Sequence, residues 1–166
     1  KIVLVATNSN GDISLDTNGK LIITDTNQTP ESGKLYYIAV AVDSNGKPLT
    51  AQNGTVDLTY GITSDSLDKD ATANTDYDNT TTITTKVGVV FEVKTKDDYY
   101  AEGDENFTVK ITYLENSPYE TPSIDTTKDT VTSTITDNPV KVEQPDTGTG
   151  NDDPTNGNYG EEDTVY

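Results

Sequence analysis

The sequence contains no cysteine, histidine, arginine, methionine or tryptophan. Without cysteine the chain forms neither disulfides nor thiolate metal sites, and without histidine it has no imidazole ligand and no histidine-dependent catalytic triad. Basic residues are scarce, because 11 lysines stand against 29 acids and the net charge is −18. Nucleic-acid binding needs a basic surface, so this charge excludes a nucleic acid as partner. No apolar run approaches the ~20 residues that cross a bilayer, so no transmembrane segment is expected.

The chain begins without methionine or a signal peptide and stops at Thr164-Val165-Tyr166. It reads as a segment of a longer polypeptide, with neighbouring modules of the same chain as partners. An acidic, cysteine-free composition rich in Thr, Asn and Gly is typical of bacterial surface proteins. We therefore expect an extracellular or bacterial cell-surface location, and a monomer for this fragment.

Apolar residues make up 31% of the chain and are concentrated in short runs that alternate with polar residues. This period of two predicts β-strands, and no stretch shows the apolar period of a helix. Threonine suits strand surfaces, while Asn, Asp and Gly suit tight turns. We therefore predict an all-β fold, an immunoglobulin-like antiparallel β-sandwich of about seven strands. The predicted strands are residues 20–25, 34–42, 55–63, 80–85, 87–95, 106–114 and 129–136.

Composition divides the chain into three parts. Residues 20–138 hold all the predicted strands and form the sandwich. Residues 1–19 contain a short apolar alternation at Ile2 and Leu4 followed by two Asn-Gly turn signals, which predicts an N-terminal extension or an edge strand. Residues 139–166 are rich in Pro, Gly, Asn and Asp and lack periodicity, which predicts a linker or the start of a next module.

Strand order predicts where the acids gather. If consecutive strands alternate in direction, the loops after the first, third and fifth strands share one end of the sandwich with the end of the seventh. These loops carry most of the acids, whereas the loops at the other end carry fewer acids and three lysines. We call the first end the acidic pole. Its acids are Asp25, Glu31, Asp65, Asp68, Asp70, Asp76, Asp78, Asp97, Asp98, Glu102, Asp104, Glu105 and Asp137.

The densest acidic loop is residues 97–105, with the sequence DDYYAEGDE and no basic residue. Carboxylates this close repel one another, and folding raises their local density further. Oxygen ligands on a flexible loop, without His or Cys, suit Ca²⁺, which we predict as the cofactor. A solvated acidic loop in an acidic protein is the alternative that this pattern leaves open.

Four segments resemble the Calx-β domain, a module of sodium–calcium exchangers, integrin β4 and large bacterial adhesins. The family's first two strands resemble LIITD followed by PESGKLYYIAV, and its third strand with the following loop resembles TVDLTYGITSDSLDKDATANTDYD. Its most characteristic run, Asp-Asp-x-x-x-Glu-x-x-Glu-x-Phe, matches KDDYYAEGDENFTVKIT, and its closing strand resembles VTSTITDN. The resemblance covers about residues 20–138.

The resemblance implies Ca²⁺ bound at one pole. By position, the ligands that it implies are Asp25, Asp76, Asp97, Asp98, the main-chain carbonyl of Tyr100, Glu102, Glu105, Asp137 and Asn138. Glu31 is either a further ligand or an acid of its turn. Two departures concern the family's terminal triple acid, which is Asp137-Asn138-Pro139 here, and its Pro-Gly-Glu turn, which is Lys86-Val87-Gly88. A site that depends on the triple acid is weakened or lost.

Taken together, these features predict a Ca²⁺-binding module of a large extracellular adhesin that acts in surface attachment, with a host-surface glycan or protein as a further partner. The competing hypothesis is a module that binds carbohydrate or peptide with Ca²⁺ at or near the binding site, and a Ca²⁺ sensor is a third. An enzyme is not expected, because the acids are too densely clustered to give one raised and one ordinary carboxyl pKa.

Overall fold

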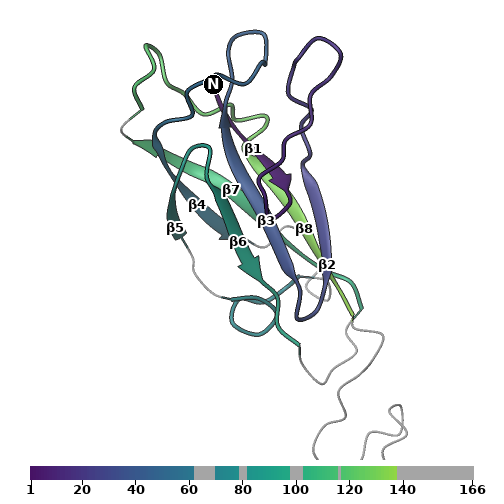
Figure 1. Cartoon of the computed structure of the whole chain (residues 1–166). Helices are drawn as coiled ribbons and strands as arrows, with labels where there is room; N and C mark the ends of the chain where they lie inside the picture. The colour runs from purple at the N-terminus through teal and green to yellow at the C-terminus, as the bar shows by residue number, and fades with distance from the viewer. Residues whose placement is uncertain (62–69, 79–81, 98–102, 116, 138–166) are drawn as a thin grey trace, which may run out of the picture.

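The computed structural model describes residues 1–61, 70–78, 82–97, 103–115 and 117–137, which form eight strands in two sheets (Figure 1). One sheet has the order β1-β3-β6 and the other β2-β8-β7-β4-β5. Among these residues no helix is long and apolar enough to cross a membrane. The strands are β1 (Ile2–Thr7), β2 (Thr26–Pro30), β3 (Lys34–Ala41), β4 (Thr55–Gly61), β5 (Thr82–Lys86), β6 (Val90–Lys94), β7 (Glu105–Glu115) and β8 (Thr130–Thr136).

The core lies between the two sheets and follows from the alternation in the sequence. Phe107, Val109 and Ile111 of β7 are buried, and the residues between them face outward. Val131 and Ile135 of β8 are buried in the same way, as predicted. Because successive side chains of a strand point to opposite faces, each strand presents one apolar face to the other sheet. The prediction of an all-β sandwich is confirmed.

The predicted strand at residues 20–25 is wrong, because the corresponding strand is β2, which begins at Thr26 and pairs in parallel with β8. Leu21 and Ile23 instead pack on the outer face of the three-stranded sheet, in a second apolar cluster with residues of β1 and β3. Thr24 O accepts a hydrogen bond from Ala6 N (2.8 Å), and Asp25 O accepts one from Thr132 N (2.8 Å). The apolar alternation of this segment therefore serves to cover a sheet face and not to form a strand.

Strand β1 accounts for the eighth strand, one more than the sequence predicts. It pairs antiparallel with β3 and is one of the two edge strands of its sheet. Both faces of β1 are buried, since Ile2 and Leu4 enter the main core while Val3 and Val5 join the second cluster. The first residues of the chain therefore take part in both apolar clusters. The predicted linker, residues 139–166, lies outside the described residues.

The strand register identifies the acidic pole. The end of β2 meets the end of β8 (Pro30 with Thr136), and the start of β3 meets the end of β6 (Lys34 with Lys94). The starts of β5 and β7 lie at the same end, since β5 begins opposite the last part of β4 and β7 begins opposite Ile135. The loops predicted to share one pole therefore do share it. In Figure 1 this is the lower end, away from the N-terminus.

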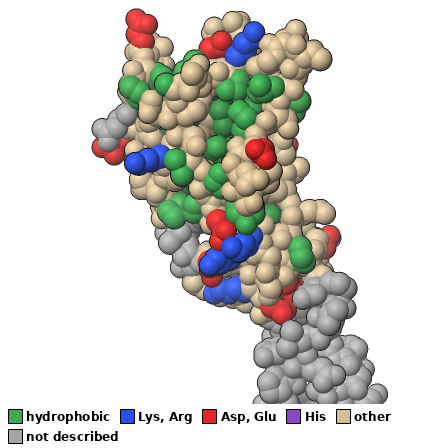
Figure 2. Space-filling view, viewed as in Figure 1, with side chains coloured by type: hydrophobic (Ala, Val, Ile, Leu, Met, Phe, Trp, Pro, Cys, Tyr) green, Lys and Arg blue, Asp and Glu red, His purple; other side chains and the backbone are tan. Residues whose placement is uncertain are grey.

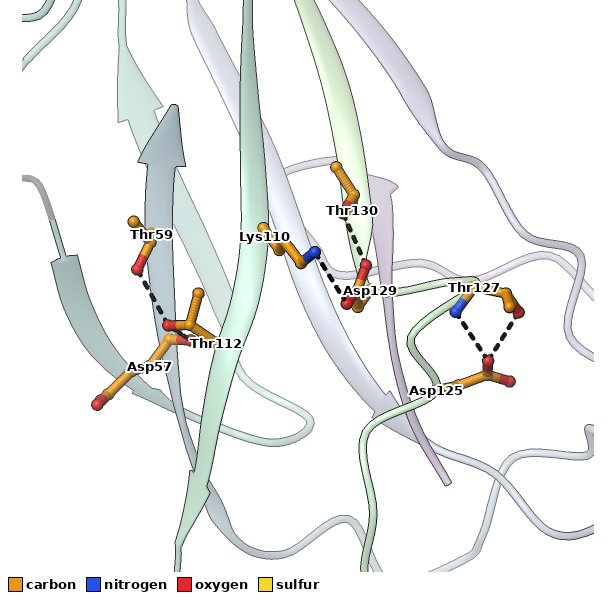
Figure 3. A network of polar contacts seen from close by, with 8 residues as sticks. All are labelled: Asp57, Thr59, Lys110, Thr112, Asp125, Thr127, Asp129 and Thr130. Atoms are coloured by element: carbon orange, nitrogen blue, oxygen red, sulfur yellow. Dashed lines mark hydrogen bonds and ion pairs between the residues drawn. The ribbon is translucent and has the colours of Figure 1, made fainter. Parts of the chain in front are cut away.

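Acids at the opposite end are held within their own turns. Residues 16–20 (DTNGK) and 43–47 (DSNGK) form equivalent turns, in which the first Asp accepts hydrogen bonds from the main-chain N–H of the Asn and Lys at 2.8 and 2.9 Å. Donation from Lys20 N–H lowers the pKa of Asp16, and donation from Lys47 N–H lowers that of Asp43. Nearby, buried Asp129 pairs with the Lys110 ammonium at 3.6 Å (Figure 3). These carboxylates already have partners.

Candidate metal site at the acidic pole

Thr95, just after β6, ties the β2–β3 turn to the acidic pole. Its N–H donates to Gly33 O (3.0 Å), its hydroxyl donates to Pro30 O (2.9 Å), and the same hydroxyl accepts from Gly33 N (2.8 Å). Thr95 is only 5% exposed, so these bonds are shielded from water. They place the turn that carries Glu31 beside Thr95, which lies two residues before Asp97.

A second set of bonds connects this turn to β8 and β7. Glu31 N donates to Thr136 O at 3.1 Å, which places Glu31 next to the end of β8. One residue further, the Asp137 carboxylate accepts from Gly103 N at 2.9 Å. Glu105, at the start of β7, is the register partner of Ile135. The segments that carry Glu31, Asp137 and Glu105 therefore lie side by side.

Asp76 joins the pole from the chain between β4 and β5. Its carboxylate accepts a short hydrogen bond from Thr72 N, and its own N–H donates to Thr72 O at 2.9 Å. Asp76 O in turn accepts from Lys96 N at 2.8 Å, directly before Asp97. Asp76 is 7% exposed, a low value for a carboxylate. The turn that contains Asp76 is thereby held against the segment that leads into the densest acidic loop.

An aromatic stack anchors this turn to the core. Tyr77 lies against Phe107 of β7, with ring centroids 4.3 Å apart and ring planes at 15°. Burial raises the pKa of the Tyr77 hydroxyl, and the neighbouring Asp76 charge raises it further. Aromatic pairs of this kind contribute about 0.5–1.5 kcal/mol beyond the area that they bury. The position of Asp76 thus depends on the same packing that forms the sandwich core.

The structure brings together the segments of five predicted ligands: Glu31, Asp76, Asp97, Glu105 and Asp137. It does not bring Asp25 to them, although the prediction placed it at this pole. Asp25 precedes β2, whereas the pole lies at the other end of that strand. At about 3.3 Å per residue, five residues of strand separate Asp25 from the pole by roughly 16 Å. The remaining predicted ligands, Asp98, Tyr100, Glu102 and Asn138, lie outside the described residues.

The donor set fits Ca²⁺. Among the described residues no three acidic side chains lie close enough to hold a metal ion by themselves. Glu31, Asp97, Glu105 and Asp137 are partly buried and offer oxygen only, which suits a hard cation of high coordination number and gives no soft ligand for zinc or copper. Asp97 directly precedes residues 98–102, which hold three more of the predicted oxygen donors and lie outside the described residues.

Lysines also lie at this end of the molecule, at the ends of strands and not within the acidic loops. Lys34 of β3 forms an ion pair with Glu92 of β6 at 3.1 Å, and this hydrogen bond raises the Lys34 pKa. Lys96 Nζ donates to Asn74 O at 2.7 Å. Figure 2 shows basic and acidic side chains adjacent to one another on the lower part of this face. The acidic pole is therefore partly balanced by lysines on one side.

Asp70 is a buried acid that sequence reasoning did not select as a ligand. It is 8% exposed and forms a β-bridge with Asn106, the residue after Glu105. Ala71 N donates to Asn106 O at 2.9 Å, and Ala71 itself is buried in the main core. The sequence feature that indicates the burial of Asp70 is its neighbour Ala71, because an apolar residue in a polar loop indicates that the chain contacts the core there.

Replacing Thr95 by valine should destabilise the fold by about 1–3 kcal/mol, because it keeps the side-chain shape but removes two buried hydrogen bonds of the hydroxyl, so that Gly33 N–H and Pro30 O retain only their 3.1 Å bond to each other. Urea unfolding measures the effect. The matched control is Thr26→Val on the exposed surface of β2, which should change the free energy of unfolding by no more than about 0.5 kcal/mol. Equal effects of the two substitutions on the free energy of unfolding would contradict a stabilising role for the Thr95 hydroxyl.

No protein-family model matches the chain, and no curated protein sequence matches it. Several solved structures are similar to it, among them the following two. The structure of CBD12 from CALX1.2 is 17% identical, with a TM-score of 0.49, and the match covers 68% of this chain and 42% of that one. The apo form of the Calx CBD1 domain is 15% identical, with a TM-score of 0.45, and the match covers 82% of this chain and 97% of that one.

Both structures are Calx-β domains, the family that the sequence resembles. The chain spans less than half of the CBD12 structure and nearly all of the CBD1 domain. The fold class of this chain is established by its own strand order and register.

Proposed function

We propose that this chain is a Ca²⁺-binding β-sandwich module of a large extracellular bacterial adhesin, rigidified by ions at the acidic pole and acting in surface attachment. The observation that carries the proposal is the continuous series of hydrogen bonds at this pole. It runs from Asp76 through the residues before Asp97 to the turn of Glu31, and from there through Thr136 to Asp137 and Gly103. Acid-bearing segments that are far apart in the chain are thereby brought to one end of the sandwich.

The chemistry of the bound ion would be electrostatic. Ca²⁺ accepts several carboxylate and carbonyl oxygens at once, so it offsets the repulsion between these acids. Glu31 lies beside Thr136, the last residue of β8, and Asp137 directly follows it. Holding both would fix the direction in which the chain continues towards a neighbouring module. The module would then act as a stiff spacer, a non-catalytic role.

The proposed extracellular location sets the affinity for Ca²⁺ that we expect. Extracellular Ca²⁺ modules bind with dissociation constants of about 10⁻⁴–10⁻³ M. A site of this class would fill in the Ca²⁺-rich extracellular medium and stay empty inside the cell. A chain with this net charge of −18 would fold more readily once the ion is available, because self-repulsion opposes compaction. Its partners would be adjacent modules and a glycan or protein of the host surface.

Calorimetric titration of chelator-treated protein with CaCl₂ tests the proposal. Saturable binding is expected, and MgCl₂ should bind more weakly, because Mg²⁺ demands a tighter octahedral site and dehydrates reluctantly. A Glu31→Gln variant should bind Ca²⁺ more weakly if Glu31 is a ligand, and with unchanged affinity if it is only an acid of the turn. Absence of Ca²⁺ binding to the wild-type protein would refute the proposed function.

A further inference from the structure

Four Asn-Gly pairs lie in the described part of the chain, and their asparagines are all exposed: Asn10-Gly11, Asn18-Gly19, Asn45-Gly46 and Asn53-Gly54. Such pairs can deamidate without an enzyme. The glycine main-chain nitrogen loses its proton and bonds to the asparagine Cγ, the bond from Cγ to the side-chain nitrogen breaks, and ammonia leaves. Water then opens the cyclic imide to aspartate or isoaspartate. Because all four asparagines are accessible to water, their exposure does not predict which one deamidates fastest. The difference between them is whether the main-chain nitrogen of the following glycine is free to attack.

Three of the four nitrogens are engaged in hydrogen bonds. Gly11 N donates to Asn8 O (3.0 Å), Gly19 N to Asp16 O (2.9 Å) and Gly46 N to Asp43 O (3.1 Å). Each of these turns is closed further, because the side chain of its first residue accepts from the asparagine N–H and from the residue after the glycine. Attack on the side chain therefore requires the turn to open first.

The fourth pair is built differently. Asn53 N donates to the Tyr119 hydroxyl at 2.9 Å, and Gly54 O accepts from Val87 N at 3.0 Å. Gly54 N–H, however, donates no hydrogen bond to any group that the structure describes. A Cβ added at Gly54 would be in ordinary van der Waals contact with its neighbours, the nearest being Ser117 Cα at 3.5 Å, so packing around Gly54 does not set this pair apart and the free N–H does. Among the described residues, its nitrogen therefore has no hydrogen bond that must break before it attacks the adjacent side chain.

We propose that Asn53 is the preferred site of spontaneous deamidation in the folded protein. The reaction consumes water, releases ammonia and adds one negative charge at the start of β4. The isoaspartate product also inserts a methylene into the main chain. This occurs beside the Tyr119 hydroxyl, which bridges residues 117–123 to the preceding turn by donating to Ala51 O at 2.7 Å. The modification thus alters a contact that joins two loops at the end of the molecule opposite the acidic pole.

Incubation of the folded chain in mildly alkaline buffer, followed by peptide mass spectrometry with fragmentation, locates the product. Asn53 should convert at least about fivefold faster than Asn10, Asn18 or Asn45, which is the rate ratio expected when only the glycine N–H hydrogen bond of their turns must first be broken. In concentrated urea the four rates should converge, and Asn53→Gln should remove the product at residue 53 alone. The proposal would be overturned if the four asparagines deamidated at equal rates in the folded protein, or if Asn53 still deamidated faster than the others by the same factor in urea.

Discussion

Replacing Phe107 by alanine should destabilise the protein by about 3–5 kcal/mol, the range measured for buried Phe→Ala substitutions. Phe107 is fully buried in the main core and stacks on Tyr77 with ring centroids 4.3 Å apart. The substitution removes apolar contacts, leaves a cavity and deprives Tyr77 of its partner. Because domains are typically stable by only about 5–15 kcal/mol, this is a large fraction of the total. Urea unfolding followed by circular dichroism measures it.

The control for Phe107 is Tyr113, an aromatic residue of the same strand that is 54% exposed. Tyr113→Ala should change the free energy of unfolding by about 0.5 kcal/mol or less, since it leaves no buried cavity. If both variants unfolded at the same urea concentration, the assignment of Phe107 to the core would be wrong. The Phe107 variant should also gain less stability from Ca²⁺, because Tyr77 is adjacent to Asp76.

Ca²⁺ should raise the melting temperature of the chelator-treated protein. For a site that binds only the folded state, an ion concentration ten times the dissociation constant contributes about 1.4 kcal/mol, and further sites would add to it. Each kcal/mol corresponds to a shift of about 2–8 °C in the melting temperature of a domain of this size range. Differential scanning calorimetry in chelator and in Ca²⁺ measures the shift. An identical melting temperature in both buffers would contradict stabilisation by the ion.

Neutralising one carboxylate at the acidic pole should affect the melting temperature differently in chelator and in Ca²⁺. Without Ca²⁺, Asp97→Asn removes repulsion within the acidic loop and should leave the melting temperature unchanged or raise it. With Ca²⁺, the same variant loses a ligand and should gain less stability than the wild type. Asp25→Asn is the matched control, because Asp25 is exposed and lies at the far end of β2. If the Asp25→Asn control also gained less stability from Ca²⁺ than the wild type, Asp25 would have to be a ligand after all.

The end of the sandwich at which the acid-bearing segments lie could be predicted from the order of strands along the chain. Because consecutive strands alternate in direction, every second loop lies at the same end of the sandwich. This rule needs no knowledge of contacts, and it places the segments of Glu31, Asp76 and Asp137 at one pole, where the structure has them. Asp25 was misplaced because the first strand was assigned six residues too early. Asp70 was overlooked as a buried acid because its bridge to Asn106 joins segments 36 residues apart.

By itself, the sequence determined the elements whose apolar residues alternate, such as Phe107, Val109 and Ile111 in β7, because the pleat of a strand turns alternate side chains to one face. Only the tertiary structure decided β2, since TNQTP has no such alternation and becomes a strand through parallel hydrogen bonds to β8, a hundred residues later in the chain. The same is true of residues 20–25, whose apolar side chains cover a sheet face that exists only after β1 and β3 have paired. Local periodicity reports which face of a segment is buried, whereas the choice of partner depends on segments distant in the chain.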